Sequence, residues 1–235
     1  MTITETVTRT TSFDRLRAVS FDLYRDIHKG IRSELFALVS HAGRLDPADE
    51  CGAASLVDQV QGVVRLLEQH AEHEDGAIQP VLEQHAPSMA SHVADDHHRI
   101  EGLMDDLIAL AIETRETPRR RAVLHELYLD LASFTSEYLA HQDLEEREVG
   151  QALDSILGFD GMLAVHASII GRIPPHELGA SLAIMFPAMN VDDRTELLGG
   201  MKASAPAEAF DAVWGLAASV LSPDDHRAIA VRLGL

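Results

Sequence analysis

The sequence predicts an all-α protein: an up-and-down four-helix bundle followed by a smaller helical C-terminal region. Three observations support this prediction. Apolar residues recur at spacings of three and four along most of the chain, which is the period of an amphipathic helix. Alternating runs of β-branched residues, which are typical of strands, are absent from the sequence. Turn-forming residues interrupt the helical pattern at intervals that suit four long helices.

These interruptions divide the chain into three parts. Residues 1–12 are rich in threonine, lack periodicity and are expected to form a flexible tail. Residues 13–157 contain the four long helices, which are separated by 45–47 (Leu-Asp-Pro), 85–88 (His-Ala-Pro-Ser) and the basic segment 115–121. Residues 158–235 form the helical extension, beginning at a glycine-containing turn. Its four shorter helices are expected to open at or near Pro174-Pro175, Asp193, Ser204 and Ser222.

Each of the four long helices has one apolar stripe, and each stripe contains one histidine in its middle. In chain order these histidines are His28, His70, His97 and His141. Two of the stripes also carry a glutamate one helical turn later, Glu74 on the second helix and Glu145 on the fourth. The bundle is therefore expected to bury four imidazoles and two carboxylates near one another.

The charge and cysteine content exclude several classes of function. The chain has 38 acidic and 19 basic residues, with a formal net charge of −19. Nucleic acids and anionic membrane surfaces favour Lys and Arg, so we expect neither as a partner. The single cysteine, Cys51, rules out an intramolecular disulfide and a multi-thiolate metal site. Since no apolar leader or run of membrane-spanning length stands out, the cytoplasm is the expected location.

A lone histidine on an apolar face is usually a hydrogen-bonded core residue, and one His-x-x-x-Glu spacing is weak evidence. Buried carboxylates without partners are costly, however, so four buried histidines beside two buried glutamates indicate a cation at the centre. Six such ligands exceed the four of a structural zinc site and suit iron or manganese. The Glu-x-x-His pairs of ferritin-like sites and the His-Glu-x-x-His motif of zincins are both absent.

With these residues placed, the sequence resembles the hemerythrin family in its bacterial HHE cation-binding branch. Residues 70–74 (His-Ala-Glu-His-Glu), with Pro80 after them, match the family's His-x-x-x-Glu followed by proline. Residues 96–104 match its acidic-His-x-x-Ile-x-x-Leu-hydrophobic pattern, and residues 141–146 match a second His-x-x-x-Glu-Glu. His28 stands where the first helix supplies its single ligand. The resemblance covers roughly residues 13–157.

The resemblance implies a hemerythrin-like bundle that holds two iron ions in an oxo- or hydroxo-bridged di-iron centre. The terminal ligands would be His28, His70, His97 and His141. Glu74 and Glu145 would bridge the two irons.

The chain departs from the family's oxygen carriers at one position on the third helix. Those members have a second histidine one turn after the third-helix ligand, and this chain has Glu101 there. We expect Glu101 to coordinate one iron or to lie within hydrogen-bond reach of it. The added negative charge would favour the ferric state and shorten the life of an oxygen adduct. Two alternatives stay open, with His92 in place of His97 and His73 as a further ligand.

The expected function is that of a non-haem di-iron protein that reacts with O2 or peroxide and is redox-active toward a small molecule, as an oxidase or oxygenase is. The alternative is a non-catalytic module that binds or senses O2 or iron reversibly. The helical extension could form a lid, a substrate pocket or the interface of a homodimer. The sequence leaves these roles open and names no substrate.

Overall fold

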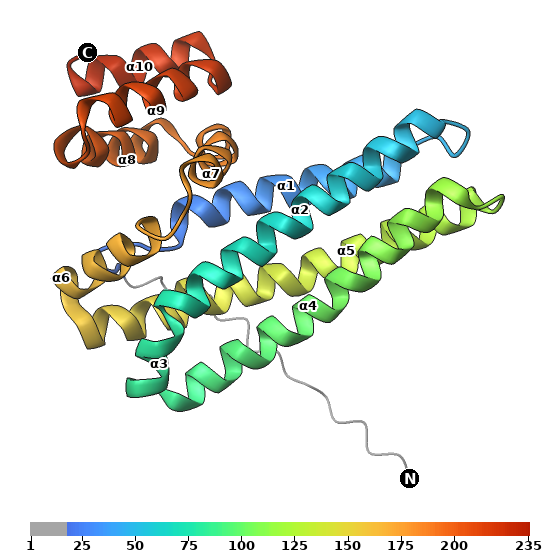
Figure 1. Ribbon diagram of the computed structural model, residues 1–235, viewed down its shortest axis with the longest axis horizontal. Helices are drawn as coiled ribbons and strands as arrows, with labels where there is room; N and C mark the ends of the chain where they lie inside the picture. Colours follow the sequence, from blue (N-terminus) through green and yellow to red (C-terminus); the bar gives the residue numbers. More distant parts are fainter. Residues whose placement is uncertain (1–17) are drawn as a thin grey trace.

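The computed structural model of the protein describes residues 18–235, and all regular elements in this part of the chain are helical. The predicted tail, residues 1–12, lies outside the described residues. Figure 1 shows long helices side by side in a bundle, with a cluster of shorter helices against one side of it. The predicted fold class is therefore confirmed: an all-helical protein with further helices after the bundle.

Four long helices build the bundle: α1 (Arg25–Arg44), α2 (Glu50–Ala77), α4 (Pro87–Glu116) and α5 (Arg120–Leu144). The short α3 (Gln79–His85) connects α2 to α4 at one end. The predicted apolar stripes face inward and form a continuous core. Its fully buried members include Ile31, Leu35, Leu56, Leu67, Leu127 and Leu131.

The first long helix starts later than the sequence pattern predicts. The pattern is helical from residue 13, whereas α1 begins at Arg25 and the described residues before it are irregular. The Asp22 carboxylate accepts hydrogen bonds from the backbone N–H groups of Tyr24 and Arg25, at 3.0 and 2.9 Å. An Asp side chain that binds nearby backbone N–H groups stabilises a turn in place of helix, which explains the later start.

The fourth long helix is interrupted at Gly158, as predicted, although helical structure resumes beyond it. It runs through a π-helical turn, η1 (Glu145–Val149), into α6 (Gly150–Ile170). Gly158 bends α6, with φ at +62° and ψ at −177°, a conformation open essentially to glycine alone. Beyond the bend, Met162 and Val165 pack into the same core cluster as Leu82 and Leu153 at one end of the bundle. The second half of α6 therefore covers this end of the bundle.

The remaining helices form a smaller unit with a core of its own: α7 (Pro175–Ala188), α8 (Val191–Ser204), α9 (Ala207–Val220) and α10 (Pro223–Leu233). The starts of α7 and α10 agree with the prediction, and Ser222 caps α10 by accepting from the backbone N–H of Asp225. Asn190 caps α8 in place of the predicted Asp193, and Ser204 ends α8 rather than opening α9.

The extension packs closely on α1. A Cβ atom at Gly30 would lie 3.4 Å from Ile184 and from the backbone of Met185 on α7, so the two helices approach to within van der Waals contact. Asp193 on α8 forms ion pairs with Lys29 and, at 3.6 Å, with Arg25. These contacts place the extension beside the start of α1, next to the buried histidines of the bundle.

One helical stretch of the described chain, Arg120–Ile170, meets the length and composition of a membrane-spanning segment. Its most apolar window has a mean hydropathy of 1.4, and 17% of that window is buried. This departs from the sequence expectation that no apolar run approaches spanning length. A single such stretch is weak evidence, and Gly158 interrupts the helix within it. The expectation of no membrane partner therefore stays a prediction.

Candidate metal centre

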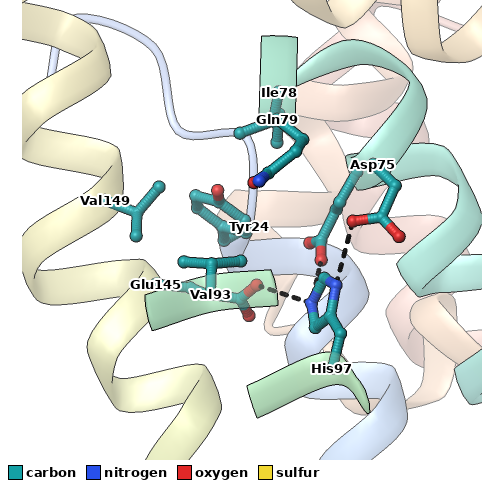
Figure 2. A pocket seen from close by; sticks show the side chains of 9 residues that line it. Tyr24, Asp75, Ile78, Gln79, Val93, His97, Glu145 and Val149 are labelled. Carbon is teal, nitrogen blue, oxygen red and sulfur yellow. Dashed lines mark hydrogen bonds and ion pairs between the residues drawn. The ribbon is translucent and has the colours of Figure 1, made fainter. Parts of the chain in front are cut away.

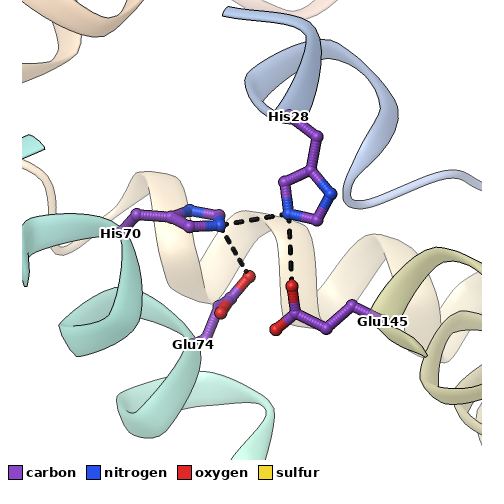
Figure 3. Close-up of side chains that lie close together, drawn as sticks. All are labelled: His28, His70, Glu74 and Glu145. Atoms are coloured by element: carbon purple, nitrogen blue, oxygen red, sulfur yellow. Dashed lines mark hydrogen bonds and ion pairs between the residues drawn. The ribbon is translucent and has the colours of Figure 1, made fainter. Parts of the chain in front are cut away.

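The four stripe histidines and two stripe glutamates meet inside the bundle. They form two groups of four residues, which share Glu74 and Glu145. The first group adds His28 and His70, and the second adds His97 and His141. Within each group the candidate ligand atoms lie within 4.8 Å of one another, and every member is buried. Figure 3 shows the first group, with imidazoles and carboxylates pointing toward one another.

Each glutamate directs its two oxygens to different histidine pairs. Oε1 of Glu74 lies 3.1 Å from Nε2 of His70 in the first group, and Oε2 lies 3.7 Å from Nε2 of His97 in the second. Glu145 also divides its two oxygens between the two groups. Its Oε1 lies 3.2 Å from Nε2 of His141, and its Oε2 lies 3.4 Å from Nε2 of His28. This is the arrangement of two carboxylates that bridge two adjacent cations.

The π-helical turn contributes to this placement, because η1 begins at Glu145 itself. The backbone N–H of Gly150 bonds to the carbonyl of Glu145 five residues earlier, so the helix is wider here than a regular α-helix. Single π-helical turns of this kind occur frequently at functional sites. The sequence does not predict this turn, because the apolar spacing around it fits an α-helix.

Three carboxylates behind the histidines fix the orientation of the imidazoles. Nδ1 of His28 lies 2.9 Å from Glu146, and Nδ1 of His97 lies 3.0 Å from Asp75. Asp96 lies 3.6 Å from Nδ1 of His141, within ion-pair distance but without a hydrogen bond. A carboxylate hydrogen-bonded to Nδ1, as at His28 and His97, orients the ring and leaves Nε2 for a metal.

Asp75, Asp96 and Glu146 were not among the site residues predicted from the sequence. Each is adjacent in sequence to a candidate ligand: Asp75 follows Glu74, Asp96 precedes His97, and Glu146 follows Glu145. This adjacency is the signal that could have identified them.

The interior of the site fits a cation. Two pairs of Nε2 atoms face each other, at 3.1 Å between His28 and His70 and at 3.2 Å between His97 and His141. Both oxygens of Glu74 and Oε2 of Glu145 are buried without a hydrogen-bond partner in the described chain. Unpaired buried carboxylate oxygens are unfavourable by themselves, and bound cations would satisfy them.

The pKa shifts of the site residues without metal also indicate that the site suits a cation. Burial lowers the pKa of His70 to about 3, so its imidazole is neutral, as a metal ligand must be. Burial raises the pKa of Glu74, and the charge of Glu145 raises it further. Burial also opposes protonation of His97, but hydrogen bonds with Asp75 and Glu145 raise its pKa to about 9. Protons therefore balance the buried charge where no cation is bound, and metal binding would release them.

The structure does not bring Glu101 to this site. Its side chain is 59% exposed and lies 4.0 Å from His98, which is 93% exposed. The buried face of α4 runs through His97, Ile100 and Met104, and Glu101 lies outside that face. The expected coordination by Glu101 is thus corrected.

Neither alternative histidine joins the two groups. His92 is 62% exposed and lies 3.8 Å from Asp96. His73 lines a separate, larger cavity next to the site.

A void of about 10 Å³ adjoins the site, which is room for about one water-sized molecule. Glu74, His97, Glu145, Tyr24 and Ile78 are among the residues that line it. Figure 2 shows Tyr24 and Ile78 near His97 and Glu145. Burial raises the pKa of Tyr24, and the charges of Glu74 and Glu145 raise it further, so its hydroxyl remains protonated. A molecule of a few atoms can therefore approach the carboxylates beside a hydroxyl group.

These features define a helical-bundle protein with a buried, two-part cation site of histidine and glutamate. The family model described as "Hemerythrin HHE cation binding domain" matches residues 19–153, more than half of the chain. The chain therefore belongs to the hemerythrin HHE cation-binding family, as the sequence resemblance indicated. Comparisons with curated proteins and with solved structures gave no match.

His97 and His98 provide a matched test of the site, because they are neighbours on α4 with opposite exposure. We expect His97→Ala to weaken metal binding by at least about 100-fold, since one of the two groups then keeps a single histidine. His98→Ala should leave metal binding unchanged. Metal analysis after desalting, with calorimetric titration, measures both. Equal metal content in the two variants would contradict the assigned site.

Proposed function

We propose that this protein is a non-haem di-iron protein that reacts with O2 or peroxide and is redox-active toward a small molecule. The observation that supports this best is the division of each glutamate's oxygens between two histidine pairs. Two cations bound in this way would share both carboxylates and differ only in their histidines. Bound iron supplies one-electron redox chemistry and a position for an oxygen ligand.

The ligand set supports iron and leaves room for an exogenous ligand. Each cation would receive two imidazole nitrogens and one oxygen from each of Glu74 and Glu145. Mixed imidazole and carboxylate ligands suit iron, and four protein atoms are fewer than an octahedral ion accepts. The water-sized void beside Glu74, His97 and Glu145 lies where such a ligand would enter.

The rest of the site supports controlled access. The carboxylates of Glu146, Asp75 and Asp96 hold three imidazoles in place. Tyr138 is buried near the site, and burial together with the charges of Glu145 and Glu74 raises the pKa of its hydroxyl. Glu74 and Glu145 are buried, and the low dielectric around them strengthens their interaction with a cation.

The second candidate function is reversible binding or sensing of O2 or iron. One observation favours it: Glu101 lies at the surface, so the additional negative charge expected near the metal is absent. Against it, the third helix supplies one histidine to the site, where the oxygen carriers of the family have two. A large cavity beside His70 and Glu74 also offers space for a molecule other than oxygen.

The experiment that tests the proposal is a stopped-flow absorption measurement. Anaerobically reduced, iron-loaded protein is mixed with O2 and its spectrum is followed over time. We expect rapid and irreversible oxidation of the iron, with no stable adduct that releases O2 when oxygen is removed. Glu101→Gln is the control and should oxidise at the same rate, because its side chain lies outside the site. A stable adduct that disappears when oxygen is removed would establish reversible binding, and one bound zinc per chain would refute the di-iron centre.

A further inference from the structure

A cavity of about 500 Å³ lies between the bundle and the C-terminal extension. Its volume falls within the range of about 300–1,000 Å³ that is usual for small-molecule sites. The residues around α1 and α2 form one side, and α6, α7 and α8 form the other. Most of its wall is apolar, with Phe21, Ile27, Leu66, Leu163, Ile170 and Met185 among the lining residues.

The cavity reaches the metal centre. His70 and Glu74 line it, and Tyr24, Glu74 and Ile78 line both this cavity and the water-sized void. A molecule in the large cavity would therefore be separated from the void by the side chains that the two spaces share. The metal centre thus has two neighbouring spaces of very different size.

His70 differs from the other three histidines of the centre. In each of the others a carboxylate faces Nδ1. The carboxylate paired with His70 in the described chain, Glu74, faces Nε2 rather than Nδ1, and His70 is the member of the four that lines the large cavity. The side of the centre without a supporting carboxylate is thus the side that the cavity reaches.

The charges around the cavity indicate what it would accept. Asp22, Asp26, Glu74 and Glu196 line it, against one permanent cation, Arg25. Arg25 is already paired with Asp26 at 2.8 Å and with Glu196 at 3.1 Å. An anionic ligand would meet net negative charge and no free cation on this wall. Burial lowers the pKa of His166, whose neutral ring also lines the cavity and suits an uncharged polar group.

We propose that this cavity binds an uncharged, largely apolar small molecule against the His70–Glu74 side of the metal centre. The proposal rests on the proposed function for the role of that molecule as substrate. Binding itself depends only on the cavity.

Two glycines provide a matched test in the full-length protein. A Cβ atom added at Gly200 or at Gly215 would meet nothing within 4 Å, so larger side chains fit at both positions. Both glycines are exposed, but Gly200 on α8 is among the residues that line the cavity, whereas Gly215 on α9 is not. Nile red, an uncharged apolar dye, serves as the probe, and its fluorescence is titrated against each variant. We expect Gly200→Trp to weaken dye binding about tenfold by filling the cavity, and Gly215→Trp to leave it unchanged.

The class of ligand is tested by competition. 1-Decanol should displace the dye, and decanoate of the same chain length should not, because of the acidic wall. Equal competition by both, an unchanged affinity in Gly200→Trp, or no dye binding by the unmodified protein would each overturn the proposal. Gly200→Leu adds a smaller side chain and should weaken binding less, which keeps the test valid if the tryptophan variant does not fold. Iron content should stay the same in every glycine variant, so a failure here is distinct from a failure of the di-iron proposal.

Discussion

Glu145→Ala is expected to abolish the binding of both metal ions. One oxygen of Glu145 faces His141 and the other faces His28, so the residue belongs to both histidine pairs. Its removal leaves Glu74 as the one carboxylate for two cations, which lowers the charge of the site and opens the bridge. Iron content should fall from about two ions per chain to a small fraction of one. A histidine variant should instead affect mainly the ion bound by its own pair.

Iron analysis by emission spectroscopy after anaerobic loading and desalting measures this difference. Glu101→Ala is the control, since it removes a glutamate from the surface of the same bundle. It should retain both ions. If Glu145→Ala kept one tightly bound ion per chain, Glu145 would be a terminal ligand of the other ion and the shared-carboxylate arrangement would be incorrect.

Metal removal is expected to lower the thermal stability strongly. The metal-free site buries three carboxylate oxygens without hydrogen-bond partners in the described chain. A ligand that binds only the folded state stabilises it by about 4 kcal/mol when its free concentration is about 1,000 times its dissociation constant. For a chain of this size each kcal/mol shifts the melting temperature by about 2–4 °C. We therefore expect Tm to fall by on the order of 10 °C when a chelator removes the metal.

The same reasoning predicts that Glu74→Gln has opposite effects on Tm in the metal-free and the iron-loaded protein. In the metal-free protein this substitution removes a buried carboxylate whose charged form burial disfavours, so Tm should rise above that of the metal-free parent. In the presence of iron the variant should be less stable than the parent, because the bridging carboxylate is lost. Differential scanning calorimetry of both proteins in both states measures this. A parallel change of Tm in both states would show that Glu74 acts independently of metal.

The main features of the fold and of the site could be predicted because they depend on helical period. Four long amphipathic stripes position four histidines and two glutamates on inward faces, and packing the stripes together brings these residues to one level. The same period explains the error at Glu101. A residue four positions after His97 lies near the edge of the stripe, where spacing alone does not decide between core and solvent. In the structure, α4 packs against its neighbours so that Glu101 faces solvent.

Features that depend on local hydrogen bonds or on tertiary packing were not predicted. The start of α1 depends on Asp22, whose side chain competes with the helix for backbone N–H groups. The π-helical turn at Glu145 has no distinct apolar spacing. The large cavity arises where residues on α1 and α2 meet α7 and α8, helices that lie far apart in the sequence. No pattern within one helix contains that information.

The bend at Gly158 also determines the geometry between the two helical units. A residue with a Cβ atom at these backbone angles would be strained by on the order of 1–3 kcal/mol. Relief of that strain would straighten α6 and carry Met162 and Val165 away from the end of the bundle. The extension could then no longer meet α1 along the same surface. The backbone conformation of one glycine thus sets how the bundle and the extension meet. The cavity between them therefore depends on a residue that is not among those lining it.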